Sequence, residues 1–311
     1  MNERLSKEEA QVVSPLTGEE ARVLKKIDVD TIVKEWKKCF NYDVGSLFTG
    51  RKELLLCECL TTAYKFYYPA VEGDSRLYEH LQRYPWYYMP WKWEHDVALG
   101  YIEDGMKVLE IGCGRGGFLS GILDRRKVDA TGLELNVAAA QACGEKGLDA
   151  VVEDVKAHAL SHAGEYDVVC AFQVLEHIFE VRLFLDDVIK CLKPGGVLLI
   201  SVPNDESIFG DLFSVLNAPP HHVGLWNKTA LRALEALWAV ELKTIEYEPL
   251  QRYHAGGVAG LVEQKLTKGR RIMKMAYRLS GYHRIINKAV ECLSKWLTGH
   301  SVVAIYTLKE R

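Results

Sequence analysis

The chain is predicted to be an α/β protein with a mostly parallel sheet. Two observations predict this fold class. Short apolar runs typical of buried strands alternate with helical segments between residues 105 and 203, which is the order of β-α-β units. Glycine or acidic residues follow several of these runs, at the sheet edge where open α/β folds bind ligands.

Each element follows from its own pattern of apolar residues. The expected strands cover residues 106–112, 129–135, 149–154, 166–172 and 195–203, followed by late strands at 239–250 and 300–310. The expected helices cover residues 117–126, 136–147 and 182–192. Gly147 ends the second helix, because glycine readily adopts the backbone conformation that terminates helices.

Four regions are expected along the chain. Residues 1–95 form an N-terminal accessory region, beginning with a loose, charged leader over residues 1–30, and residues 96–250 form the core. Residues 251–299 form a basic helical insertion, and residues 300–311 return to the core as its last strand. Eleven aromatic residues lie between Tyr64 and Trp93. This density indicates either an accessory core or the wall of a binding pocket, and the stretch 84–93 is expected to cover a ligand.

The overall composition excludes several classes of protein. A net charge of −3 is not that of a polycation that binds nucleic acid. No run of 18 apolar residues predicts a membrane span, and the charged N-terminus lacks the apolar stretch of a signal peptide. The eight scattered cysteines are interpreted as reduced thiols, so a cytoplasmic protein is expected.

A glycine-rich loop follows the first core strand. Gly112, Gly114 and Gly116 would let a ligand approach the backbone at the start of a helix, although ordinary turns and nicotinamide enzymes have such loops too. Glu110, inside the strand end, would repel a pyrophosphate but suits an ammonium or sulfonium group. Glu134 is placed to accept from ribose hydroxyls and Asp154 from an adenine amino group, although Glu153 could replace Asp154. A cationic adenosine without phosphate fits these features.

Four motifs in order resemble the class I S-adenosylmethionine-dependent methyltransferases, including members that act on small molecules and glycans. The motifs are "VLEIGCGRGGF", "GLEL", "EYDVVCAFQVLEHI" and "LKPGGVLLISVPN", within residues 100–245. The resemblance implies a doubly wound, Rossmann-like sheet of seven strands with the last antiparallel. It also implies S-adenosylmethionine as cofactor, held by Glu110, Gly112, Cys113, Gly114, Gly116, Glu134, Leu135, Asp154, Val155, Phe172 and Gln173. A non-catalytic module, or another enzyme chemistry on the same sheet, remains an alternative.

The stretch "PPHHVGLWN", residues 219–227, supplies the candidate catalytic residues. It follows a strand at the ligand-binding edge, and an oxygen acceptor must lose a proton to a base such as histidine. His222 is interpreted as the base and His221 as its orienting partner, with His177 next in line; alternatively, His221 and His222 cap a helix near residue 227. No metal is expected, because adjacent histidines do not readily share an ion and no third ligand is suitably spaced.

The methyl acceptor is expected to be a small-molecule hydroxyl, most plausibly of a sugar or lipid-linked glycan, with a quinol-type, nitrogen or carbon acceptor as alternatives. Residues 173–177 lack the Asn/Asp-Pro-Pro-Tyr/Phe motif of enzymes that methylate nucleobase amino groups. Residues 265–295 carry nine lysines and arginines against one acid, and apolar residues recur there at helical spacing. This segment is interpreted either as a solvated basic face or as a surface for a diphosphate or an anionic membrane.

Overall fold

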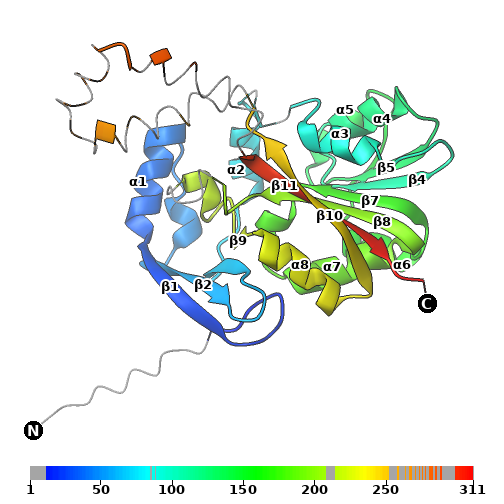
Figure 1. Cartoon of the computed structure of the whole chain (residues 1–311), viewed down its shortest axis with the longest axis horizontal. Helices are drawn as coiled ribbons and strands as arrows, with labels where there is room; N and C mark the ends of the chain where they lie inside the picture. Colours follow the sequence, from blue (N-terminus) through cyan, green and yellow to red (C-terminus); the bar gives the residue numbers. More distant parts are fainter. Residues whose placement is uncertain are drawn as a thin grey trace, which may run out of the picture.

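The computed structural model describes residues 12–84, 86–87, 89–207, 214–251 and 298–310, with scattered residues between 258 and 288. Two sheets organise these residues, one of seven strands and one of four (Figure 1). The larger sheet contains β4 (Lys107–Ile111), β5 (Asp129–Leu133), β6 (Asp149–Val151), β7 (Tyr166–Phe172), β8 (Leu192–Pro203), β10 (Val240–Pro249) and β11 (Thr298–Leu308).

The larger sheet has the strand order β10-β11-β8-β7-β4-β5-β6. Neighbouring strands from β8 to β6 pair in parallel, whereas β11 pairs antiparallel with both β8 and β10. The predicted Rossmann-like sheet, with seven strands and an antiparallel last strand, is therefore confirmed. Because β4 lies between β5 and β7, the loops after these three strands meet at one edge of the sheet, where ligands bind in such folds.

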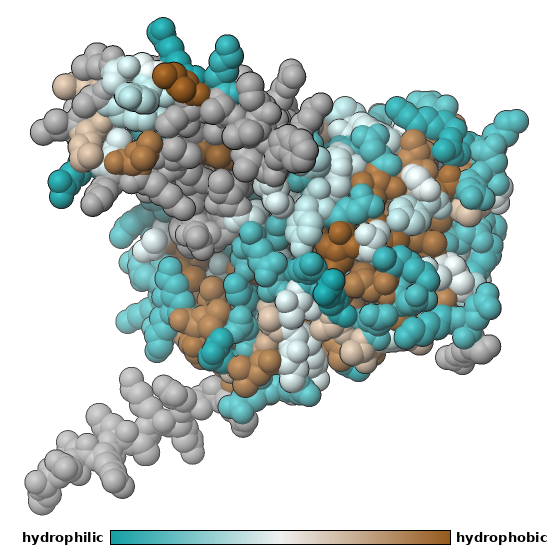
Figure 2. Space-filling model, in the orientation of Figure 1, coloured by the Kyte–Doolittle hydropathy of each residue, from teal (hydrophilic) through white to brown (hydrophobic). Residues whose placement is uncertain are grey.

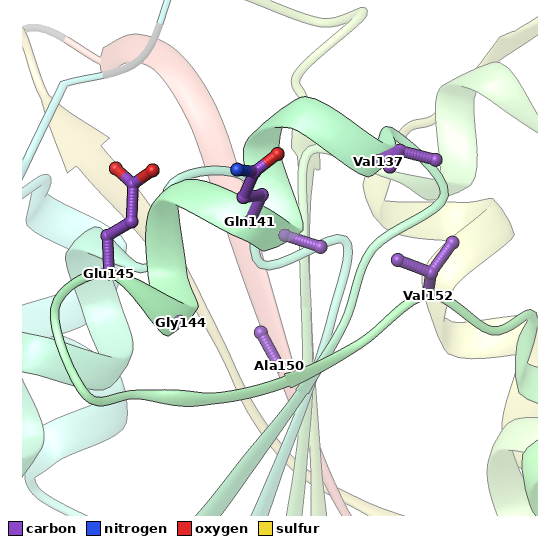
Figure 3. Close-up of a pocket in the computed structure, with 7 residues that line it drawn as sticks. Val137, Gln141, Gly144, Glu145, Ala150 and Val152 are labelled. Carbon is purple, nitrogen blue, oxygen red and sulfur yellow. The ribbon is translucent and has the colours of Figure 1, made fainter.

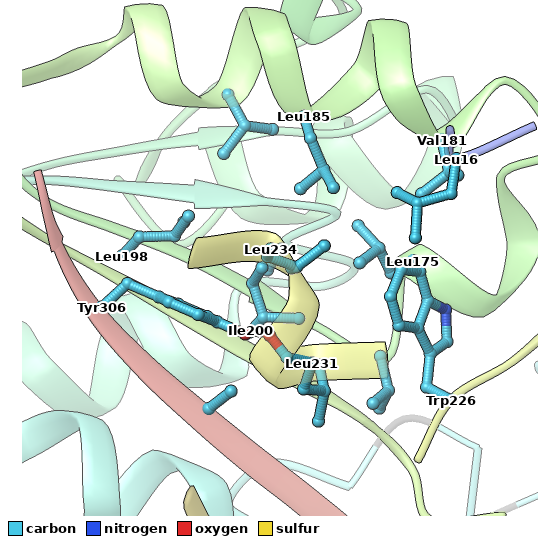
Figure 4. Packing of buried hydrophobic residues seen from close by; sticks show 14 of the residues in the cluster. Leu16, Leu175, Val181, Leu185, Leu198, Ile200, Trp226, Leu231, Leu234 and Tyr306 are labelled. Atoms are coloured by element: carbon cyan, nitrogen blue, oxygen red, sulfur yellow. Dashed lines mark hydrogen bonds between the residues drawn. The ribbon is translucent and has the colours of Figure 1, made fainter. Parts of the chain in front are cut away.

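Helices cover both faces of this sheet, so its strands are apolar on both sides. One face packs against α3 (Trp93–Leu99), α4 (Gly117–Leu123) and α5 (Val137–Gly144), and the other against α6 (Val155–Ser161), α7 (Val181–Lys190) and α8 (Lys228–Leu237). Neighbouring residues of β4 contribute to opposite faces: Val108 packs with the first group and Leu109 with the second. Figure 4 shows the second face, where Leu185, Ile200 and Leu234 meet.

The smaller sheet was not predicted. It has the order β1-β2-β3-β9 and contains β1 (Ala21–Asp28), β2 (Glu53–Cys59), β3 (Lys65–Tyr68) and β9 (Gly224–Leu225). The loose leader expected over residues 1–30 is wrong from residue 12 onward, because β1 pairs with β2 and the side chain of Leu16 is completely buried. Residues 1–11 lie outside the described residues.

The smaller sheet is joined to the core through β9, which comes from the loop after β8 and pairs with β3. A hydrophobic cluster shared by the two sheets contains Cys57, Tyr64 and Phe66 from the N-terminal side and Leu109 and Trp226 from the core side. A second N-terminal cluster surrounds Trp36 of α1 (Val29–Phe40) and Leu77 of α2 (Ser75–Leu81). The accessory region is therefore packed against the strand-end loops of the core.

The molecular surface in Figure 2 mixes apolar and hydrophilic residues, with hydrophilic residues frequent at its outer edges. Single exposed apolar side chains such as Leu24 and Leu183 are ordinary on a folded protein. No helix of the described residues combines the length and apolar character that crossing a membrane requires. Most of the predicted basic insertion, residues 251–299, lies outside the described residues, so its amphipathic helices stay a prediction.

Candidate active site

The glycine loop connects the end of β4 to the start of α4. Gly112 and Gly116 have φ angles of 75° and 73°, a backbone conformation that side chains disfavour. A Cβ atom on Gly112 would lie 2.6 Å from Cγ2 of Val174, and one on Gly116 would collide with Leu148. Glycine is thus required at both positions by conformation and by space. The contact with Val174 also brings the loop against the segment that follows β7.

Glu134, directly after β5, holds this loop in place. Its Oε2 accepts a hydrogen bond of 2.8 Å from the backbone N–H of Gly114, and its Oε1 accepts one of 2.8 Å from Asn136. An ionised carboxylate can accept about four hydrogen bonds. Glu134 therefore retains acceptor capacity for the two ribose hydroxyls that the sequence assigns to it, and its cofactor role remains a prediction.

Glu110 is buried in β4, with only 4% of its surface exposed. Burial raises the pKa of its carboxyl group to about 8, while the charge of Lys92 acts in the opposite direction and that of Glu134 adds to the rise. Its Oε2 has no hydrogen-bond partner among the described residues. A buried carboxylate without a partner is costly; a ligand ammonium would donate a hydrogen bond to it, and a sulfonium would offset its charge. The site thus fits the cationic cofactor that the sequence predicts.

Asp154 forms the N-cap of α6, where its Oδ1 accepts a hydrogen bond of 2.7 Å from the N–H of Ala157. The alternative acceptor, Glu153, is engaged by His158, whose Nδ1 lies 2.9 Å from Glu153 Oε2. Both carboxylates keep acceptor capacity beyond these bonds, so the assignment of Asp154 to the adenine amino group remains a prediction. Val155 is buried behind Asp154, whereas Leu135 is 70% exposed and therefore accessible to a ligand.

Phe172 and Gln173 end β7 beside the glycine loop. Gln173 has a φ angle of 56°, and its backbone N–H and side-chain amide both donate to Ser201, at 2.8 and 2.9 Å. Phe172 packs against Phe118 of α4, with ring centroids 4.9 Å apart. Cys113 is buried, and a Cβ on Gly132 would lie 2.6 Å from its Sγ. All the predicted cofactor residues of the glycine loop, β5 and β7 thus lie along one edge of the sheet.

Residues of the aromatic stretch 84–93 contact two parts of the molecule, the start of α4 and the candidate catalytic histidines. Trp91 stacks on Phe118 of α4 and also contacts His95. Pro90 lies close to the start of α4, because its carbonyl oxygen would be 2.6 Å from a Cβ on Gly117. Tyr87, by contrast, lies with its ring centroid 6.0 Å from that of His221. The stretch therefore packs on the helix after the glycine loop and reaches the histidines, and its role in covering the cofactor remains a prediction.

Three histidines meet beside this edge, and we call His177, His221 and His222 the histidine cluster. His177 belongs to η2 (Leu175–His177), directly after β7, and the other two lie in the loop between η3 (Val215–Asn217) and β9. The rings of His221 and His222 stack with centroids 4.3 Å apart, and that of His177 stands edge-on to both at 4.8 and 4.9 Å. One ring nitrogen from each of the three lies within 4.8 Å of the others.

Backbone carbonyls set the orientation of two of these rings. His177 Nδ1 lies 2.6 Å from the carbonyl oxygen of His221, and His221 Nδ1 lies 2.9 Å from that of Leu216. A carbonyl oxygen only accepts, so both Nδ1 atoms carry the proton and both Nε2 atoms present a lone pair. Burial lowers the pKa of His177 to about 4 and of His221 to about 3, and it lowers the pKa of His222 well below 6.5.

Glu176 is a fourth member of this site that was not predicted from the sequence. It is 1% exposed, and its Oε1 lies 3.9 Å from His222 Nε2 and 4.0 Å from His177 Nε2. Burial raises the pKa of its carboxyl group to about 8. One sequence feature could have pointed to Glu176: it is the acidic residue in "LEH", and a glutamate inside an otherwise apolar segment is rarely buried without a specific partner.

The structure overturns two expectations about His221 and His222. Neither caps α8, because Asn227 is the N-cap and its Oδ1 accepts a hydrogen bond of 2.8 Å from Ala230. The absence of a third metal-ligand candidate is also wrong, since His177 completes a group of three. Sequence spacing could not reveal this group, because 44 residues separate His177 from His221.

A separate pocket of about 530 Å³ lies at the far edge of the larger sheet. Figure 3 shows Val137, Gln141 and Glu145 lining it from the α5 side, with Ala150 and Val152 opposite. None of its lining residues belongs to the histidine cluster or the glycine loop. This pocket therefore contains no candidate catalytic residue.

The family of the chain is settled by residues 86–248, which match a family described as a methyltransferase domain. The match covers more than half of the chain and contains the glycine loop, Glu134, Asp154 and the histidine cluster. The chain belongs to this methyltransferase family. S-adenosylmethionine, the predicted cofactor, is the cofactor of the family.

Curated relatives match about a third of this methyltransferase. A ubiquinone biosynthesis O-methyltransferase of Psychrobacter arcticus is 37% identical over 130 residues, which are 36% of this chain and 50% of that protein. The protein of the same name from Escherichia coli is 36% identical over 120 residues, which are 35% of this chain and 50% of that protein. The chain thus spans about half the length of the curated relatives it matches.

A solved structure of a methyltransferase from Archaeoglobus fulgidus has a TM-score of 0.47 and 20% identity, and the alignment covers 69% of this chain and 91% of that one.

Proposed function

We propose that this methyltransferase transfers the methyl group of S-adenosylmethionine to a hydroxyl group of a small aromatic acceptor of the phenol or quinol type. The observation that carries this proposal is the histidine cluster beside the glycine loop. Val174 contacts Gly112 at the loop, and Glu176 and His177 follow Val174 directly in η2. Groups able to take a proton thus adjoin the predicted cofactor site.

Methyl transfer is a displacement at the sulfonium carbon, so correct placement of the acceptor oxygen supplies much of the rate. A hydroxyl group is a weak nucleophile until its proton leaves, and a positioned base contributes about 10²–10⁴-fold to such reactions. In this proposal His222 takes the proton, while the stacked His221 and edge-on His177 hold its ring in place. A neutral imidazole is the form that accepts a proton.

Two observations support an aromatic acceptor. The ring of Tyr87 lies 6.0 Å from His221 between centroids, and those of Trp36 and Tyr78 lie 6.3 Å from it. Aromatic side chains favour contact with a flat ring, which they can meet face or edge-on. The matching curated relatives are named as ubiquinone biosynthesis O-methyltransferases, a name that implies a quinone-type acceptor.

The second candidate for the methyl acceptor is a sugar hydroxyl, the acceptor expected from the sequence. It is favoured by the net charge of +8 in residues 265–295, which suits a phosphate-linked acceptor or an anionic membrane surface that presents it.

The proposal is tested by incubating the full chain with S-adenosylmethionine labelled in its methyl group and with three matched sets of acceptors. These sets are ortho-dihydroxyphenols, the corresponding aminophenols blocked at oxygen, and nucleotide-linked sugars. We expect label to enter the dihydroxyphenols. Label confined to sugars would support the second candidate, and label confined to the amines would contradict transfer to oxygen altogether.

A further inference from the structure

The histidine cluster and Glu176 surround buried polar atoms that nothing in the described part of the chain satisfies. His221 Nε2, His222 Nδ1 and both carboxylate oxygens of Glu176 are buried without a hydrogen-bond partner. Native proteins rarely leave such atoms unpaired, because their desolvation is costly. Four of them on three residues in contact indicate that something else occupies the space between them.

The hydrogen bonds that the cluster does make prepare two imidazoles for a metal ion. His177 and His221 each donate Nδ1–H to a backbone carbonyl, which leaves the Nε2 lone pair of each ring available. Metal-binding histidines almost always donate their other N–H to a carbonyl or carboxylate in this way, because the bond fixes the tautomer and the ring orientation. A cluster buried only for packing would not require this shared orientation.

The distances suit an ion after small rotations of the side chains. One ring nitrogen from each of the three histidines lies within 4.8 Å of the other two, and Glu176 Oε1 lies 3.9 and 4.0 Å from Nε2 of His222 and of His177. Ligands at about 2.0–2.1 Å from a tetrahedral ion stand roughly 3.4 Å apart. The rings therefore need to close by about an ångström, which imidazole and carboxylate rotations provide.

We propose that His177, His221, His222 and Glu176 bind a divalent transition-metal ion, with zinc as the best fit. Three imidazoles with one carboxylate favour zinc over magnesium or calcium, which prefer oxygen ligands. In the ionised form, Glu176 would also supply negative charge beside the ion, which three neutral imidazoles cannot do. The side chain of His177 is 17% exposed, so an ion can enter from its side.

The chemical role of this ion rests on the proposed function. An ion in the cluster accepts the acceptor oxygen as an additional ligand, the O–H bond breaks, and the proton passes to solvent. The resulting oxygen anion then attacks the methyl carbon of S-adenosylmethionine, so a C–O bond forms, the C–S bond breaks and S-adenosylhomocysteine leaves. A bound cation lowers the pKa of a coordinated hydroxyl, so it replaces His222 as the group that promotes proton loss, and His222 becomes a ligand.

The experiment is a binding titration of the metal-free full chain with zinc, followed by titration with cobalt(II), whose visible spectrum reports nitrogen ligands. We expect one ion per chain with a dissociation constant in the micromolar range or below. His177→Gln, His221→Gln and Glu176→Gln should each weaken binding by about 100-fold or more, since even outer-shell changes cost about 10–100-fold. Cofactor affinity and cooperative unfolding serve as checks that each variant is folded.

His162→Gln is the matched control. His162 is also stacked on another histidine, His158, and lies 2.6 Å from a glutamate, but it belongs to the end of α6 and its side chain is 38% exposed. Its substitution should leave zinc affinity unchanged. If a variant does not fold, the wild-type chain still decides, because zinc should raise its melting temperature and a chelator should reverse the rise.

Zinc binding only in the millimolar range, or equal binding by wild type and the folded cluster variants, would overturn the site. The zinc titration gives its answer whether or not the chain transfers methyl groups to the tested acceptors. Zinc binding without any methyl transfer supports the metal site and contradicts the proposed function. Transfer that survives complete removal of the metal supports His222 as the base and contradicts the role proposed for the ion.

Discussion

At the scale of single side chains, two acidic residues are the main predicted ligands of the cofactor. Glu134 is exposed enough to meet a ligand and is oriented by the N–H groups of Gly114 and Asn136. Glu110 is buried and lacks a hydrogen-bond partner on Oε2 in the part of the chain that the structure describes. The first is therefore suited to neutral hydroxyl donors, and the second to a cation.

Replacing Glu134 with alanine removes the acceptor for two ribose hydroxyls. We expect the change to weaken binding of S-adenosylmethionine by about 1–3 kcal/mol, the cost of leaving buried donors unpaired. Glu134→Gln keeps one acceptor oxygen and should fall between the alanine variant and wild type. Isothermal titration measures all three proteins, and an unchanged dissociation constant in Glu134→Ala would remove this residue from the site.

Glu110 should make cofactor binding release a proton. Its raised pKa, about 8, leaves the carboxyl mostly protonated at pH 7 in the free protein, and a cationic ligand favours the ionised form. Binding at pH 7 should therefore release close to one proton, and the release should disappear as the pH rises above 8. The released protons are counted by titration calorimetry in buffers of different ionisation enthalpy.

Glu110→Gln is the control for this proton release. The ammonium group of the cofactor itself titrates near pH 8, but at pH 7 most of it is already charged before it binds, so its contribution to proton release is small in both proteins. The difference between wild type and variant thus isolates Glu110, whose neighbours Lys92 and Glu134 remain in place. Equal proton release from the two proteins would show that Glu110 is ionised before the cofactor binds.

Asn227 links α8 to the N-terminal sheet at the scale of secondary-structure elements. Its Oδ1 caps α8 through Ala230, and its Nδ2 donates a hydrogen bond of 2.9 Å to the carbonyl of Ala63, in the turn between β2 and β3. It is 4% exposed. The side chain of Asn227 therefore fixes the loop that carries His221 and His222 to the accessory region.

Asn227→Ala should lower the free energy of unfolding by about 2–3 kcal/mol, because it removes a helix cap worth about 1 kcal/mol and the hydrogen bond to the carbonyl of Ala63, a residue of intermediate burial. Asn136→Ala is the matched comparison: Asn136 caps α5 through Ala139 and should cost only about 0.5–2 kcal/mol. Urea denaturation measures both variants. A loss no larger for Asn227 than for Asn136 would mean that the bond to Ala63 contributes nothing.

The core elements could be predicted from sequence because their patterns are local. The run 166–172 is apolar throughout, as a strand covered on both faces must be, and β7 occupies those residues. The N-terminal sheet could not be predicted in this way. β1 has exposed residues at five consecutive positions, 22–26, so it lacks alternation, and β9 is a strand of two residues recruited from a distant loop.

The residues of the candidate site likewise fall into those whose positions the sequence predicts and those whose positions it does not. The glycine loop and Glu134 stand directly after β4 and β5, and Asp154 stands between the end of β6 and the start of α6, so their approximate positions follow from topology alone. Glu176 and the approach of His177 to His221 depend on a loop that returns 44 residues later, and no local spacing encodes it. The metal-ligand geometry was missed for this reason.

At the scale of the whole molecule, the two sheets enclose the predicted reaction site between them. The core sheet supplies the glycine loop and His177, and α2 and the aromatic stretch of the N-terminal region supply the rings around His221. The loop before β9 carries His221 and His222 between these two parts. We therefore expect cofactor binding to depend mainly on the core and the choice of acceptor to depend on both regions.

The most direct test of this account compares wild type with His222→Gln, in a single turnover with labelled S-adenosylmethionine and an ortho-dihydroxyphenol. His222 acts on the acceptor either as the base or as a metal ligand, and it is not among the residues assigned to the cofactor. We predict that transfer to the phenol falls by about 10²–10⁴-fold, while the dissociation constant for the cofactor changes less than a few-fold. Transfer by the variant at the wild-type rate would contradict the assignment of proton removal to the histidine cluster.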